Sequence, residues 1–122
     1  MEQFDSAQNE YIDLPAALGR VRGNKKLYRR MLDMFLSSTE FDVLEQCLSQ
    51  GDLEGAVAPA HAIKGIAGNL SFIKLFDTST ALLESLRNNS YSDALAQTYR
   101  QALQQTQVAV KALAQDLDAQ LS

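Results

Sequence analysis

The residues best suited to chemistry surround His61, the only histidine in a chain of 122 residues. An α-helix turns by about 100° per residue, so residues three and four apart share a face. One face of the helix expected here gathers an imidazole, a cation and two residues without a side chain: His61, Lys64, Gly65 and Gly68. The other face is an apolar stripe: Ile63, Ile66, Ala67 and Leu70. The pattern predicts a solvent-exposed imidazole near the middle of the long side of a helical bundle.

The two glycines have two interpretations. Each glycine in a helix interior costs about 0.8–1.0 kcal/mol relative to alanine, so its presence needs a reason. Gly65 and Gly68 lie one and two turns beyond His61, where larger side chains would crowd the imidazole. They either let a neighbouring helix pack closely or clear a surface for a partner. Their position opposite the apolar stripe favours the cleared surface.

This combination favours nucleophilic chemistry on a phosphoryl group. Neutral imidazole has a lone pair that can attack phosphorus. Phosphoryl transfer depends mostly on positioning and charge stabilisation, so an acceptor needs little machinery of its own. Lys64 lies about one turn from His61 and can interact with phosphoryl oxygens, although a simply solvated lysine is the other interpretation.

Other chemistries lack their residues. One histidine and one cysteine cannot assemble a usual zinc site unless carboxylates supply the remaining ligands. The sequence has no Walker loop and no glycine-rich dinucleotide turn after a strand, so no means of binding ATP is visible. Ser71 is more than two turns from His61 and outside any nucleophile-elbow motif, which argues against a serine hydrolase.

The run from His61 to Gly68, His-Ala-Ile-Lys-Gly-Ile-Ala-Gly, resembles the His-x-x-Lys-Gly-x-x-Gly motif of histidine phosphotransfer (HPt) domains. The likeness is to the kind found in hybrid sensor kinase phosphorelays, and it extends from about residue 12 to residue 113. Members often carry another glycine three residues after the motif, where this chain has Ser71.

The resemblance implies a phosphoryl carrier in a two-component multistep phosphorelay. His61 would accept phosphate from a receiver-domain aspartate and pass it to another receiver, and Lys64 would stabilise the phosphoryl group. Gly65 and Gly68 would lie where the receiver docks. Mg²⁺ would belong to the receiver, so the carrier would need no cofactor or metal and would not be an enzyme. The implied partners are response regulator receiver domains and the rest of a hybrid sensor kinase.

Stop and cap signals divide the chain into helices. Asp13, Asn24 and Asp52 are expected to cap helices, with Gly23 and Gly51 ending the preceding ones. We expect a short helix before Gly23, then helices over about 25–50, 53–70, 72–87 and 91–117. Ser37-Ser38-Thr39 interrupts the second pattern without a strong breaker, and Pro59 predicts a kink or short break near residues 57–59.

Short turns between long helices predict an all-α, antiparallel up-down four-helix bundle with a short additional N-terminal helix, an architecture that HPt domains share. The helix over 72–87 is expected to face inward through Ile73, Phe76, Leu83 and Leu86. A basic cluster begins the second helix, and it suits either a solvated face or a docking patch for an acidic partner: Lys25, Lys26, Arg29 and Arg30.

Composition is consistent with one domain over residues 1–122, with a helical core of about 12–117. The net charge of −4 does not suggest nucleic-acid binding. Cys47 is the only cysteine, which favours a cytoplasmic setting, and no apolar run could insert into a membrane. We expect a monomer. The alternative functions are a helical adaptor or dimerisation module whose histidine is never phosphorylated, and a metal-binding bundle.

Overall fold

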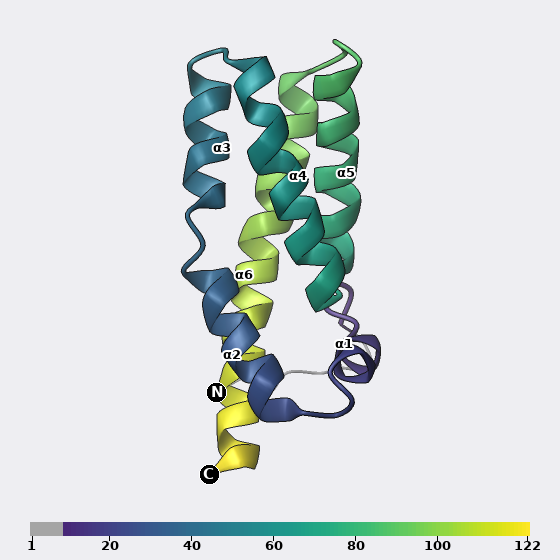
Figure 1. Cartoon of the computed structure of the whole chain (residues 1–122), viewed down its shortest axis with the longest axis vertical. Coiled ribbons are helices and arrows are strands. Elements are labelled where there is room, and N and C mark those ends of the chain that lie inside the picture. The colour runs from purple at the N-terminus through teal and green to yellow at the C-terminus, as the bar shows by residue number, and fades with distance from the viewer. Residues whose placement is uncertain (1–8) are drawn as a thin grey trace.

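The computed structural model describes residues 9–122, and these form six helices and no β-strand (Figure 1). The helices are α1 (Leu14–Arg20), α2 (Lys25–Leu36), α3 (Glu40–Ser49), α4 (Leu53–Leu70), α5 (Ile73–Arg87) and α6 (Asp93–Leu121). The all-helical class predicted from the sequence is confirmed. Residues 1–8 of the expected domain lie outside the described residues.

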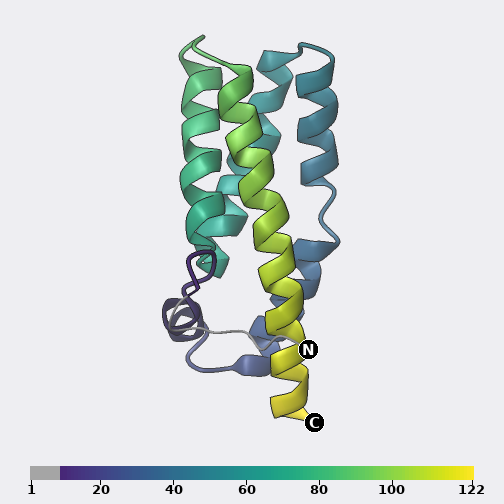
Figure 2. The ribbon, with the colours of Figure 1, turned by 180° about the vertical axis from the view of Figure 1, so that it is seen from behind.

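From α3 to α6, each helix runs opposite to the one before it, and α2 runs in the same direction as α3 (Figure 1). α4 packs against α3 on one side and α5 on the other, and α6 packs against α5 and α2. α4 therefore lies on the near side in Figure 1, and α6 lies on the near side when the molecule is turned around in Figure 2. α2 and α3 follow one another along one edge, and α1 contacts α2 and α4 at the lower end of the molecule. The outer face of α4 is left uncovered along its length.

The predicted caps of three helices are confirmed. Each is an acidic or amide side chain whose oxygen accepts a hydrogen bond from a backbone N–H of the first turn, at 2.8–3.1 Å: Asp13 for α1, Asn24 for α2 and Asp52 for α4. Such bonds satisfy donors that the helix itself cannot. Gly23 and Gly51 both adopt positive φ, which explains glycine at these two stops.

The prediction of one long helix over residues 25–50 was wrong. The chain leaves the helix at Ser37 and starts again at Glu40, so α2 and α3 are separate elements. The Ser37 hydroxyl donates to the carbonyl of Asp33 at 3.0 Å, and the Ser38 hydroxyl accepts from the N–H of Glu40 at 3.3 Å. The hydroxyls of Ser37 and Ser38 thus bond to the backbone where the helix stops and starts again, in competition with a continuous helix.

Of the kink or short break expected near residues 57–59, the break is absent, because α4 is helical without interruption from Leu53 to Leu70. Pro59 is buried, whereas Gly55, whose carbonyl loses its partner, is exposed to water that can hydrate it. The expected end at Leu70 is confirmed. The next residue, Ser71, is the C-cap in the left-handed conformation, with φ 60° and ψ 41°.

Two expectations for α5 and α6 were also wrong. Ile73 and Phe76 do not face inward, since they are 40% and 37% exposed, and the buried face of α5 runs through Leu75, Leu82, Leu83 and Leu86. The last helix begins at Asp93 rather than near Tyr91. Its cap is Ser92, whose hydroxyl accepts from the N–H of Leu95 at 3.3 Å.

Two separate contacts hold the C-terminal end of α4 in place. The buried Tyr28 hydroxyl donates to the carbonyl of Leu70 at 2.9 Å, and burial raises the pKa of Tyr28, which keeps the phenol as a donor. The segment before α1 forms an antiparallel bridge between Ile12 and Phe72. The turn between α4 and α5 is therefore held by side-chain and backbone bonds.

Candidate functional site

α4 presents His61 to solvent because its apolar residues are buried on the opposite side. Ile63 and Ala67 are fully buried and Leu70 nearly so, while His61 and Gly65 are exposed. His61 is the ninth residue of an 18-residue helix, so it lies near the middle of the long side of the molecule. No hydrogen bond to the imidazole is formed by any residue between 9 and 122. The predicted exposure of His61 is confirmed, and its ring is accessible to a second molecule.

Lys64 leans from α4 toward α5. Its Nζ lies 5.8 Å from the centroid of the Phe76 ring, within the range of a cation–π interaction. Lys64 is half-buried, and Phe76 is 37% exposed. The aromatic ring restrains the ammonium group on the same side of the molecule as the imidazole, one turn along the helix.

The two glycines have different surroundings. A Cβ added at Gly65 would meet nothing within 4 Å, which agrees with a cleared surface. A Cβ added at Gly68 would lie 3.3 Å from Cε1 of Phe76, closer than ordinary van der Waals contact. Gly68 therefore accommodates an aromatic side chain of the neighbouring helix. Of the two interpretations made for both glycines, close helix packing fits Gly68 and an open surface fits Gly65.

A hollow borders the site on the α5 side. Its volume is about 280 Å³, and it lies between α1, α4 and α5. Gly68 and Phe76 form one wall, and Arg20 of α1 contributes to the other, with the carboxylates of Asp13 and Asp77 also at the lining. We call it the Phe76 hollow. It makes the surface around Lys64 continuous with the lower end of the molecule.

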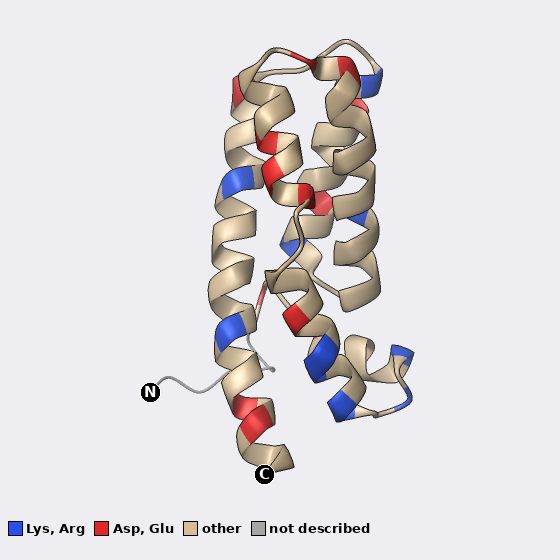
Figure 3. Ribbon diagram, turned by 60° about the vertical axis from the view of Figure 1, so that its left-hand side comes forward, with Lys and Arg blue, Asp and Glu red and all other residues tan. Residues whose placement is uncertain are grey.

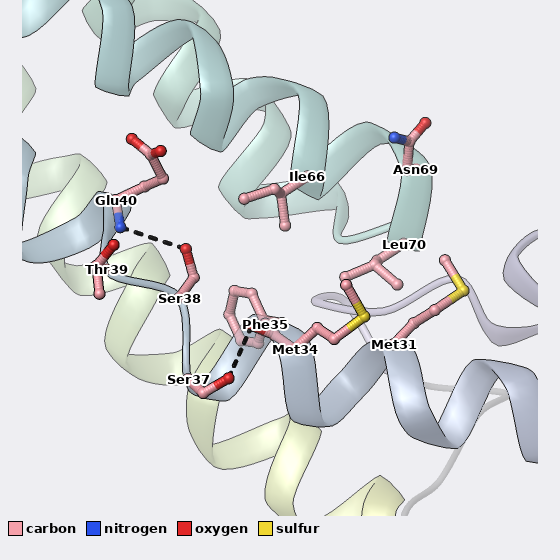
Figure 4. Close-up of a pocket in the computed structure, with 10 residues that line it drawn as sticks. All are labelled: Met31, Met34, Phe35, Ser37, Ser38, Thr39, Glu40, Ile66, Asn69 and Leu70. Carbon is pink, nitrogen blue, oxygen red and sulfur yellow. Dashed lines mark hydrogen bonds between the residues drawn. The ribbon is translucent and has the colours of Figure 1, made fainter.

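A groove borders the site on the other side, where α2 and α3 separate (Figure 4). Its volume is about 480 Å³, with an apolar floor that includes Phe35, Ile66 and Leu70. Met34 stands at its edge and is 70% exposed. The loss of helix at residues 37–39 thus opens a depression beside the outer face of α4, which the expected continuous helix would have excluded.

The arrangement supplies an accessible nucleophile and one restrained cation, and it supplies little else. Across residues 9–122, no group of three or more histidine, cysteine, aspartate or glutamate side chains is placed to hold a metal ion. The three described ion pairs join Arg29 to Asp33, Arg29 to Asp118 and Arg100 to Glu45, and none includes Lys64. An anion arriving at His61 would find the Lys64 ammonium unpaired by any described carboxylate.

Sequence reasoning missed Phe76, which both restrains Lys64 and contacts Gly68. The sequence pattern placed it on the inward face of the helix, together with Ile73, Leu83 and Leu86. The buried face of α5 instead runs through Leu75, Leu82 and Leu86. Which face of α5 is buried depends on its packing against α4 and α6.

In the described part of the chain, no helix is both long and apolar enough to cross a membrane. Searches against protein-family models, curated proteins and solved structures found no match to this chain.

Proposed function

We propose that this chain is a phosphoryl carrier of the histidine phosphotransfer type, which accepts a phosphoryl group on His61 from a receiver-domain aspartate and returns it to another receiver. The observation that carries the proposal is the exposed imidazole in mid-helix, with an open Gly65 beside it and Lys64 one turn away. The His-x-x-Lys-Gly-x-x-Gly resemblance supplies the reaction.

The all-helical fold supports the proposal. Its arrangement is compatible with an up-down four-helix bundle in which α2 and α3 share one column, α4, α5 and α6 form the others, and α1 is the short additional helix. We propose that these elements correspond to the helices of an HPt domain that acts as a monomer in the cytoplasm, alone or joined to a sensor kinase.

The transfer step needs only groups that the two partners bring. A lone pair on one imidazole nitrogen attacks phosphorus, the N–P bond forms, and the P–O bond to the receiver aspartate breaks. The aspartate leaves as a carboxylate with the electron pair of that bond. Lys64 contributes charge stabilisation to the phosphoryl oxygens, and the receiver brings the Mg²⁺ ion. The carrier needs no ATP site and is not an enzyme in its own right.

The decisive experiment uses receiver domains from the same genome, purified as a panel and phosphorylated with acetyl phosphate and Mg²⁺. The carrier should gain a phosphoryl group that is lost in acid, as expected of phosphohistidine. A serine phosphoester would survive that treatment.

His61→Gln should abolish acceptance and change the free energy of unfolding by no more than about 0.5 kcal/mol, because the side chain is exposed. Thermal unfolding of the variant is the control. Acceptance that persists in His61→Gln would contradict the carrier assignment. Receiver binding without any transfer would support the alternative, a helical adaptor whose histidine stays unmodified.

A further inference from the structure

The lower end of the molecule concentrates positive charge. Six of the 11 lysines and arginines lie between residues 20 and 30, and no aspartate or glutamate occurs between residues 14 and 32. The rest of the chain contains five cations and 15 acidic residues. Figure 3 shows the basic residues grouped on α1, on the first turns of α2 and on the loop that joins them. The protein is therefore strongly polarised, although its net charge is only −4.

Only one of these six cations is neutralised within the described residues. The Arg29 guanidinium binds Asp118 at 2.8 Å and Asp33 at 2.7 Å, which ties α2 to the end of α6. Lys25 donates to the neutral amide of Gln120 at 2.8 Å. Five cations are exposed and form no ion pair within residues 9–122, and we call them the α1–α2 basic patch: Arg20, Arg22, Lys25, Lys26 and Arg30.

The patch is continuous with the surface around His61. Arg20 lines the Phe76 hollow together with Gly68, and Phe76 in turn contacts Lys64. An α-helix rises about 1.5 Å per residue, so the nine steps along α4 from His61 to Leu70 span about 14 Å. A globular partner that covers about 800 Å² on each side can reach from the imidazole to the patch.

We infer that the α1–α2 basic patch is the charge-recognition part of the docking surface, and that its occupant is an acidic face of the receiver domain that exchanges phosphate with His61. This inference rests on the proposed function. Charge complementarity across an interface accelerates encounter and rejects partners of the wrong sign more than it adds affinity. The patch would therefore select among receivers that share the same reaction.

The extent of the patch favours a protein partner over an extended polyanion. Asp33 and Asp118, both bound to Arg29, border it. A DNA duplex or a flat anionic membrane would approach these carboxylates as well as the cations. A compact acidic area on a globular protein can meet the cations and avoid the carboxylates.

The test compares two double charge reversals with the same change in net charge. Lys26→Glu with Arg30→Glu alters the patch at two exposed positions one turn apart on α2. Arg87→Glu with Lys111→Glu alters exposed positions on α5 and α6 and serves as the control. Phosphotransfer from each receiver in the panel is quenched at successive times, which gives its rate at about 20 mM and 500 mM salt. Thermal unfolding checks that both variant proteins are folded.

With the strongest donor in the panel, the patch variant should transfer at least about tenfold more slowly than the wild type at low salt, and the control should stay within about twofold. High salt should remove the difference, because exposed charges are screened within about 4 Å at that ionic strength. Equal rates for patch variant and control, or a patch effect that survives high salt, would overturn the inference.

Binding measured separately distinguishes this inference from the proposed function. Titration of His61→Gln with unphosphorylated receivers reports docking when no transfer can occur. If receivers bind in a way that depends on the patch but the wild type transfers no phosphate, the carrier function is overturned and the docking role of the patch stands. Patch-dependent binding of a DNA duplex or of phosphatidylserine vesicles, without binding of any receiver, would overturn the protein partner.

Discussion

At the scale of single residues, the site consists of an imidazole that forms no hydrogen bond within residues 9–122 and a cation that contacts an aromatic ring. Lys64 is held by Phe76 at 5.8 Å, so its ammonium is restrained before any phosphoryl group arrives. A restrained charge loses less conformational freedom on contact with the anion than a freely rotating lysine would. The exposed Phe76 ring is thus a positioning residue for Lys64.

Lys64→Ala should slow phosphoryl transfer by about ten- to a hundredfold without abolishing it, because the charge assists the reaction but forms no covalent bond. Phe76→Leu keeps an apolar side chain and removes the ring face, so a smaller decrease in rate is expected. Single-turnover kinetics with one phosphorylated receiver measures both. A full rate in Lys64→Ala would make Lys64 an ordinary solvated lysine.

Gly65 and Gly68 should respond differently to the same substitution. In Gly65→Gln the new side chain enters open space, and glutamine is a better helix former than glycine. The free energy of unfolding should therefore rise by about 0.5 kcal/mol. The new side chain would stand beside His61 and should slow transfer by about a hundredfold through misalignment of the receiver. Gly68→Gln presses on Phe76 and should unfold at a lower temperature than Gly65→Gln.

Gly65→Ala is the matched control, since alanine improves helix propensity with little added bulk. It should be more stable than the wild type and nearly as fast. A Gly65→Gln protein that transfers at the wild-type rate would show that no partner approaches over this residue.

At the scale of helices, the elements that sequence reasoning placed correctly depend on local bonds. The caps at Asp13, Asn24 and Asp52 are signals read within four residues, and each forms its expected hydrogen bond. The break at residues 37–39 was underestimated because it depends on the Ser37 and Ser38 hydroxyls, which compete with the backbone for hydrogen bonds. The orientation of Phe76 depends on how α5 packs against α4 and α6, which no local pattern contains.

The end of α4 places a residue with a Cβ in a backbone conformation that favours glycine. Ser71 occupies the position where HPt domains often have glycine, and it adopts φ 60° as the C-cap. The N–H of Phe72 donates to the carbonyl of Ala67 at 2.9 Å, which closes the helix in the manner that glycine usually permits. The left-handed conformation costs a residue with a Cβ about 1–2 kcal/mol. Glycine avoids this cost but loses more conformational entropy on folding, so its net advantage at this position is smaller.

Ser71→Gly should therefore raise the free energy of unfolding by about 0.5–1 kcal/mol and leave the phosphotransfer rate unchanged. Ser71→Ala retains the Cβ and should show no such gain. Urea unfolding of the three proteins measures the effect, with one common slope of the free energy of unfolding against urea concentration. A gain in Ser71→Ala equal to that in Ser71→Gly would show that backbone strain is not the cause.

At the scale of the whole molecule, the candidate site lies on one uncovered helix face, and the flanking surfaces are its groove and its hollow. The sequence motif predicted the centre of this surface, because residues four apart on one helix are neighbours whatever surrounds them. It did not predict the borders. Those depend on α1 and α5 on one side and on the separation of α2 from α3 on the other.

α6 is the longest helix, with 29 residues against 12 for α2 and 10 for α3. It holds α2 through the Arg29–Asp118 pair near its end and α3 through the Arg100–Glu45 pair near its start. Because the helix is interrupted between Leu36 and Glu40, no continuous helical backbone couples the unfolding of α2 to that of α3. The lower end can therefore open as a cooperative unit of its own.

Amide hydrogen exchange should reveal that unit. Backbone amides of α1 and α2 should exchange through an opening that leaves α3 and the first half of α6 protected, with a shared free energy below that of global unfolding. Arg29→Ala should accelerate exchange in α2 far more than in α3. A protein whose helices all exchange at one common free energy would instead unfold only as a whole, and its basic end would be as rigid as its centre.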